Sequence, residues 1–163
     1  MTRPRHVTLR FLADPTNVNF GGKVHGGAVM KWIDQAGYTC AASWTGGYCV
    51  TVYVGGIHFI RPIKVGDLVE LRALVIYTGK TSVHVAVDVY SRDPKTTARH
   101  RTGHCVIVFV ALDENGKSKP VPRWEPETEV DRALAAYALR LMELRKLMDA
   151  EMESSLALQD LPI

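Results

Sequence analysis

The chain has 163 residues, of which 47% are hydrophobic and 23% charged, and its formal net charge at pH 7 is +3. A chain of this length and composition can bury a substantial core, so we expect a globular protein and not a disordered one. The mild, scattered positive charge suits an anionic small molecule. It does not indicate DNA or RNA as a partner, because no basic run is interleaved with aromatic residues.

The cysteines and the N-terminus bear on the cellular compartment. Three cysteines cannot all pair and match no zinc-binding spacing, so we expect free thiols and no metal site: Cys40, Cys49 and Cys105. The segment Met1–His6 is charged and precedes no apolar signal core. No apolar run approaches the ~20 residues that cross a bilayer. We therefore expect a soluble, cytoplasmic protein with no membrane partner.

The first predicted element is a strand at Val7–Leu12, where apolar and polar residues alternate. A loop rich in turn-forming residues follows at Asp14–Gly22. The next element is a helix at about Gly26–Trp44, which the sequence Thr45-Gly-Gly ends.

The stretch Asn19–Asp34 combines a glycine-rich loop, a helix start and one carboxylate about two turns inside the helix. Glycines let the backbone approach a ligand closely, and a helix N-terminus presents free N–H groups to negative charge. At about 100° per residue, Asp34 lies at the edge of an apolar stripe formed by Val29, Ile33, Ala36, Gly37, Cys40 and Trp44. Partial desolvation there would raise the basicity of Asp34 and make it a candidate general base. The alternative is an ordinary exposed aspartate.

The middle of the chain is predicted to form strands. Tyr48–Phe59 is rich in β-branched and aromatic residues, and Gly55-Gly56 indicates a bulge or bend within it. Two further strands are joined by a short turn, which predicts a hairpin: Leu68–Thr78 and Ser82–Ser91. The last strand is predicted at Thr102–Leu112. One helix and four or five antiparallel strands indicate an α+β fold in which the sheet covers the helix.

The C-terminal forty residues or so have a different character. Pro120 and Pro122 indicate an extended linker, and a long helix is predicted at about Glu127–Glu153. Its apolar residues form a short heptad-like seam: Leu134, Tyr137, Leu141, Leu144 and Met148. The seam packs either against the outer face of its own sheet or against another subunit. We therefore predict one domain at residues 1–123 and a helical extension at residues 124–163.

Three segments, in this order, resemble those of a known enzyme family. They are the motif Asn19-x-x-Gly22-x-Val24-His25-Gly26-Gly27-x-x-Met30-x-x-x-Asp34, the segment Phe59–Asp67 and the segment Tyr77–Val87. Together they are similar to hotdog-fold acyl-CoA thioesterases, in particular the bacterial single-domain and brain-type cytosolic acyl-CoA hydrolases. The resemblance covers roughly residues 9–123.

The resemblance implies a hotdog fold, in which a five-stranded antiparallel sheet wraps a long central helix. The C-terminal helix lies outside the well-matched part. It also implies a homo-oligomer, at minimum a dimer and further a trimer of dimers, with an active site at the dimer interface. An aspartate of one subunit works there with an asparagine of the other, and by motif position these are Asp34 and Asn19.

The resemblance further assigns roles to individual residues, with acyl-CoA as the substrate and no separate cofactor. Asp34 would be the general base or nucleophile, Asn19 would orient the water or the thioester, and backbone N–H groups of Gly27 and Gly26 would bind the oxyanion. The remaining candidates would contact the coenzyme A or acyl part of the substrate: His25, Met30, Arg61, Lys80, Thr81 and Ser82. Lys80 and its neighbours could equally be a solvated hairpin tip.

Two other functions compete with hydrolysis of acyl-CoA. An acyl-CoA hydratase or dehydratase on the same fold would need a histidine working with the carboxylate, and none follows Asp34 at short helical spacing. A non-catalytic acyl-CoA-binding or regulatory module is the other alternative. Regulators on this fold carry an attached DNA-binding segment, and nothing here resembles a helix-turn-helix.

Overall fold

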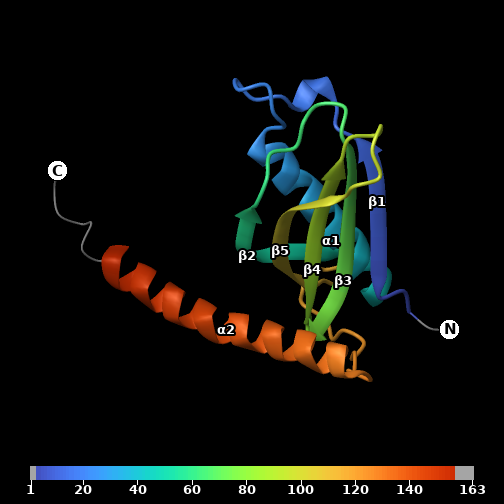
Figure 1. Cartoon of the computed structure of the whole chain (residues 1–163). Coiled ribbons are helices and arrows are strands. Elements are labelled where there is room, and N and C mark those ends of the chain that lie inside the picture. The colour runs from blue at the N-terminus through green and yellow to red at the C-terminus, as the bar shows by residue number, and fades with distance from the viewer. Residues whose placement is uncertain (1–2, 157–163) are drawn as a thin grey trace. The chain divides into compact units, whose positions relative to one another are not determined.

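Residues 3–125 contain five strands, which pair into one antiparallel sheet in the order β1-β3-β4-β5-β2 (Figure 1). The strands are β1 (His6–Leu12), β2 (Cys49–Phe59), β3 (Leu68–Thr78), β4 (Ser82–Arg92) and β5 (His100–Ala111). A 3₁₀ turn, η1 (Pro15–Asn17), and the helix α1 (Gly26–Thr45) complete this part. The structure is a computed structural model that describes residues 3–156. The predicted α+β fold is confirmed.

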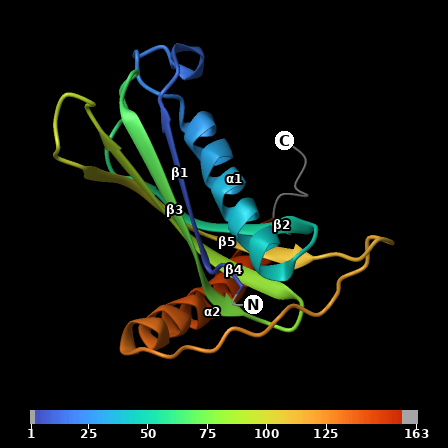
Figure 2. The same cartoon turned by 90° about the vertical axis from the view of Figure 1, so that its right-hand side faces the viewer.

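The helix α1 lies along one face of the sheet (Figure 2). Its buried residues include the whole predicted stripe, and two more widen it: Val29, Trp32, Ile33, Ala36, Gly37, Cys40, Ala41 and Trp44. On the sheet, alternate residues of each strand belong to the same core, as Val69 and Leu71 do on β3 and Val85 and Val87 on β4. This alternation places the residues between them on the opposite face, which we call the outer face.

The helix approaches the sheet most closely at Gly37. A methyl group added there would lie 3.0 Å from Cε2 of Phe109 and 3.4 Å from Cδ1 of Ile107, both on β5. Atoms in a protein core pack at about 3.5–4.0 Å, so the site has no room for a side chain. The absence of a side chain at Gly37 therefore sets the spacing between α1 and the sheet.

The strand ends differ slightly from those predicted. Strand β5 begins at His100 and not at Thr102, because His100 and Arg101 pair with Ser91 and Tyr90 of β4. The predicted hairpin between β3 and β4 is confirmed, with Gly79 N–H donating to the carbonyl of Ser82. The bend predicted at Gly55-Gly56 is also confirmed. The pairing of β2 with β5 shifts register there, and Gly56 has φ +61°.

Strand β2 forms one edge of the sheet and, among the described residues, pairs only with β5. It has 11 residues, and three of its apolar side chains are exposed: Val52, Val54 and Phe59. A long edge strand with exposed apolar side chains is unusual for a chain that remains alone, because its free N–H and C=O groups can pair with another strand.

The second compact unit comprises residues 126–163 and contains the helix α2 (Glu129–Leu156). The helix starts two residues later than predicted because Thr128 and Asp131 form a cap. The Thr128 hydroxyl accepts from Asp131 N–H at 3.1 Å, and Oδ2 of Asp131 accepts from the N–H groups of Glu127 and Thr128. Of the predicted seam, Leu134 and Leu141 are half-buried, whereas the other three residues are exposed: Tyr137, Leu144 and Met148.

Charge is divided unequally between the two units. Residues 1–125 contain 16 Lys and Arg against 9 Asp and Glu, a formal charge of +7, whereas residues 126–163 contain 4 against 8, a charge of −4. The modest charge of the whole chain therefore conceals a strongly basic first unit, which attracts anions. Within residues 3–156, neither helix is both long and apolar enough to span a membrane.

Candidate active site

The loop before α1 is held in shape by Asn19. Its side-chain oxygen accepts the N–H groups of Gly21 at 2.9 Å and Lys23 at 3.2 Å. The turn needs Gly22, whose φ of +73° other residues rarely adopt. These bonds use the amide oxygen of Asn19, and its amide NH₂ has no partner within residues 3–156. Asn19 therefore presents a hydrogen-bond donor.

His25 caps the N-terminus of α1. Its Nδ1 accepts the N–H of Gly27 at 3.0 Å, and its own N–H donates to the carbonyl of Asn17 at 2.6 Å. The imidazole therefore carries its proton on Nε2 in this arrangement. The N–H of Gly27, a predicted oxyanion donor, is already occupied here. The N–H of Gly26 is the first free donor of the helix among the described residues.

Asp34 lies about two turns into α1 and contacts β2. The hydroxyl of Thr51, on β2, donates to Oδ1 of Asp34 at 2.7 Å. The carboxylate is exposed in the single chain, so the partial burial predicted from its angular position is wrong for an isolated subunit. The second oxygen, Oδ2, makes no hydrogen bond with any described residue.

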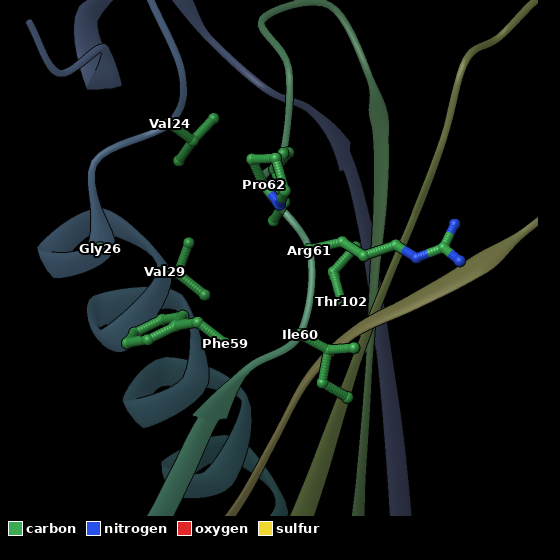
Figure 3. A pocket seen from close by; sticks show the side chains of 9 residues that line it. Val24, Gly26, Val29, Phe59, Ile60, Arg61, Pro62 and Thr102 are labelled. Atoms are coloured by element: carbon green, nitrogen blue, oxygen red, sulfur yellow. The ribbon is translucent and has the colours of Figure 1, made fainter. Parts of the chain in front are cut away.

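An apolar pocket of about 270 Å³ opens beside the N-terminus of α1 (Figure 3). Its walls come from the loop and helix on one side, and from the end of β2, the segment after it and Thr102 of β5 on the other. They comprise Val24, Gly26, Val29, Phe59, Ile60, Arg61, Pro62, Ile63 and Thr102. The N–H of Val24 donates to the carbonyl of Ile63 at 2.9 Å, which ties the two walls together. The pocket can hold an apolar group close to the free N–H of Gly26.

Besides His25, two of the predicted substrate-binding residues lie close to this region. Arg61 is part of the pocket wall, but its side chain extends away from α1 (Figure 3), and Nη1 lies 3.2 Å from Nδ1 of His100. Met30 is on α1 with 47% of its surface exposed. An exposed thioether on the helix between Gly26 and Asp34 can contact a bound acyl chain.

The other three predicted substrate-binding residues lie elsewhere in the chain. Lys80 and Thr81 lie in the turn between β3 and β4, and Ser82 begins β4, at the opposite end of the sheet from the start of α1 (Figure 1). The length of β3 separates them from the loop by roughly 30 Å. Their side chains make no hydrogen bonds with the described residues. One chain therefore does not bring them together with Asn19 and Asp34.

Thr51 is the polar residue that sequence reasoning missed. It is one of several threonines on predicted strands, and the sequence contains no local signal that distinguishes it. Its contact with Asp34 arises because β2 packs beside α1, 17 positions further along the chain.

Comparison with known proteins identifies relatives over most of the chain. Residues 21–98 match the model of the thioesterase superfamily. The VdlD protein of Helicobacter pylori is 37% identical over 139 residues, covering 85% of this chain and 79% of that protein. A solved apo hexameric acyl-CoA thioesterase is 34% identical with a TM-score of 0.85, covering 89% of this chain and 93% of that one.

A second solved relative is an acyl-CoA hydrolase of Staphylococcus aureus, in complex with butyryl coenzyme A, coenzyme A and coenzyme A disulfide. It is 28% identical with a TM-score of 0.84, covering 95% of this chain and 94% of that one. Variants of that enzyme have an asparagine, an aspartate or a threonine replaced by alanine, at positions separated by 15 and then 17 residues. Asn19, Asp34 and Thr51 have the same two separations.

Proposed function

This chain belongs to the thioesterase superfamily, and from that membership we propose that it hydrolyses the thioester of fatty acyl-CoA to a free acid and coenzyme A. The observation that carries the proposal is the hydrogen bond from Thr51 to Asp34. This bond engages Oδ1 of Asp34 and leaves Oδ2 free to act on the thioester or on water. The equal spacing of the asparagine, aspartate and threonine in a related acyl-CoA hydrolase supports the same assignment.

Asp34 acts on the thioester by one of two routes. As a general base, it takes a proton from water while the water oxygen bonds to the carbonyl carbon. The tetrahedral intermediate then collapses, the C–S bond breaks, and the departing thiolate receives a proton. As a nucleophile, Oδ2 of Asp34 itself bonds to the carbonyl carbon, the thiolate leaves, and water hydrolyses the resulting anhydride. Both routes yield one carboxylic acid and one molecule of coenzyme A.

Either route places negative charge on the carbonyl oxygen, and two donors are available for it. The amide NH₂ of Asn19 is free because the loop uses only the side-chain oxygen. The N–H of Gly26 is free at the positive end of the α1 dipole. The N–H of Gly27 becomes available only if the ring of His25 turns away. We therefore assign Asn19 and Gly26 as the principal oxyanion donors, and Gly27 as an additional one.

The working enzyme is a homo-oligomer in which Asp34 of one subunit meets Asn19 of another. The exposed edge of β2 offers a surface for this pairing, and the hexameric state of a related thioesterase supports a trimer of dimers. An assembly also allows Lys80, Thr81 and Ser82 to bind the substrate, which they cannot do within one chain. They can reach the phosphates of a coenzyme A bound mainly by a neighbouring subunit. The charge of +7 on the first unit suits such an anionic substrate.

The direct test follows release of free thiol from acyl-CoAs of short, medium and long chain length. Asp34→Asn keeps the size of the side chain and removes the base, so turnover should fall by about 10²-fold or more. Asp93→Asn, in the loop after β4, removes one carboxylate outside the site and should keep native turnover. A sample without substrate corrects for the protein's three cysteines.

The same assay separates the competing functions. A hydratase would alter the acyl chain and leave the thioester intact, whereas a binding module would retain acyl-CoA without releasing thiol. Tight binding of acyl-CoA with no thiol released at any chain length would rule out a hydrolase. Full turnover by the Asp34→Asn variant would preserve the activity and refute the assignment of Asp34.

A further inference from the structure

A second charged site lies on the outer face of the sheet, around Glu70 of β3. Its neighbours Val69 and Leu71 point into the core beneath α1, so Glu70 projects from the opposite face. Only 8% of the surface of Glu70 is exposed, and apolar packing does not account for a carboxylate at this place. The sheet therefore separates this group from Asp34 and the loop before α1.

Three arginines bind this one carboxylate. Nε of Arg10, on β1, lies 2.5 Å from Oε2, whereas Nε of Arg72 and Nη1 of Arg99 lie 2.7 Å and 2.8 Å from Oε1. The arginines come from β1, from β3 and from the loop that precedes β5. The contacts therefore gather three guanidinium groups from separate segments around a single acidic group.

An aromatic ring helps to hold two of these arginines in place. The guanidinium of Arg99 lies 4.2 Å from the ring centre of Tyr90, on β4, and that of Arg72 lies 5.5 Å from it. Stacking on a ring and bonding to Glu70 together limit the rotamers that these side chains can adopt. The donors are thus arranged before any ligand arrives, which reduces the entropy lost on binding.

The charge of this cluster is not balanced. Burial by itself raises the pKa of Glu70, but hydrogen bonds and charge from Arg10 and Arg72 outweigh it, so the pKa lies below its usual value. Glu70 is therefore ionised at neutral pH, and three positive charges surround one negative charge. Each guanidinium has five N–H groups and uses one of them on Glu70. The others have no partner among the described residues.

We propose that the cluster of Arg10, Arg72, Arg99 and Glu70 is a binding site for a phosphate-bearing small molecule. A phosphate dianion would neutralise the excess of two positive charges and would accept N–H groups from more than one guanidinium. The ligand is either a separate phosphorylated compound or the phosphate end of an acyl-CoA held by another subunit. The site is distinct from Asp34 in either case, because it lies on the other face of the sheet.

The test measures binding of inorganic pyrophosphate to the full-length protein by isothermal titration calorimetry at low salt. Arg99→Gln removes one charged donor from the cluster and should weaken binding about tenfold or more. Arg123→Gln removes the same charge from an arginine with 83% of its side chain exposed, outside the cluster, and should change the dissociation constant less than about twofold. Melting temperatures of both variants confirm that they are folded.

Three results would overturn the site: no saturable binding to the native protein, unchanged binding to the Arg99→Gln variant, or equal weakening in both variants. A steady-state arm then identifies the source of the phosphate. A raised KM for acyl-CoA in Arg99→Gln, with kcat unchanged, assigns the site to the phosphates of the substrate. An unchanged KM together with weaker pyrophosphate binding assigns it to a separate phosphorylated ligand.

Discussion

At the scale of single residues, the site depends on which atoms the fold has already engaged. The loop uses the amide oxygen of Asn19, so only its NH₂ remains to act on a ligand. Thr51 engages Oδ1 of Asp34, so Oδ2 remains. These two side chains thus keep one free donor group and one free acceptor oxygen, which are the two kinds of polar group that hydrolysis of a thioester requires.

Replacing Thr51 by valine tests whether its hydroxyl positions Asp34. Valine keeps the shape of the side chain but cannot donate a hydrogen bond. The Asp34 carboxylate therefore loses a hydrogen bond to a charged group, which contributes about 1.5–3 kcal/mol. We expect kcat to fall by about tenfold to a hundredfold while KM for acyl-CoA changes little. Steady-state thiol release at several substrate concentrations separates the two constants.

Thr51→Ser is the matched control, since it retains the hydroxyl and should recover most of the activity. Native kcat in the valine variant would show that the hydroxyl has no such role. A loss that serine does not recover would assign the effect to packing of β2 and not to the hydrogen bond.

The signals that made Asp34 a candidate are local. The glycine-rich loop, the helix start and the angular position of Asp34 can all be seen within sixteen residues. Asn19 is a candidate because of its place in the motif that resembles the thioesterase family. Thr51 could not be found in this way, because only the packing of β2 beside α1 brings it to Asp34. The burial predicted for Asp34 failed in the single chain for a related reason. Helical periodicity gives the direction of a side chain, but it does not say what covers it.

At the scale of elements, the spacing between α1 and the sheet is set at Gly37. Alanine there would bring its methyl group within 3.1 Å of two ring carbons of Phe109. Overpacking of this kind costs about 1–3 kcal/mol, whereas alanine gains up to about 1 kcal/mol over glycine in helix propensity. We expect Gly37→Ala to lower the free energy of unfolding, measured by urea denaturation at fixed protein concentration.

Gln35→Ala is a suitable comparison, because Gln35 is exposed on the same helix and has no contact to lose in the core. It should leave the free energy of unfolding within about 0.5 kcal/mol of the native value. A Gly37→Ala variant as stable as the native protein would mean that the helix can move away from β5 without cost.

The strands themselves were predictable, but their order in the sheet was not. Alternating apolar residues indicated β1, β-branched and aromatic residues indicated β2, and the short turn at Gly79–Thr81 indicated one hairpin. The pairing of β2 with β5 joins strands 40 residues or more apart in sequence, and no local pattern specifies that partner. The start of α2 was placed too early because the cap formed by Thr128 and Asp131 decides where the helix begins.

At the scale of the whole molecule, a site shared between subunits can be tested by mixing two inactive variants. Asn19→Ala keeps Asp34, and Asp34→Asn keeps Asn19, so a mixed dimer contains one complete site and one with both defects. Random assembly from equal amounts should restore about one quarter of native turnover, because half the dimers are mixed and each has one of two sites. Thiol release is measured after the subunits have been unfolded and refolded together.

Each variant refolded and assayed alone sets the background of the assay. Asn19→Ala refolded with Asp34→Ala repeats the mixing result with a second variant at Asp34. Turnover in the mixture no greater than the average of the two separate variants would place Asn19 and Asp34 of the same chain in one site. It would leave the hydrolase function intact and remove the reason to require an assembly.

The open edge of β2 also affects the chain before it has met another copy. The eleven residues of β2 have free backbone groups and exposed valines, and they can pair with an incorrect strand as readily as with the correct one. A newly made subunit is therefore at risk of aggregation. The two register shifts and the left-handed Gly56 twist and interrupt this edge, which limits the strands that can join it. Irregularity in β2 thus protects solubility during biosynthesis, at the cost of a less regular pairing with β5.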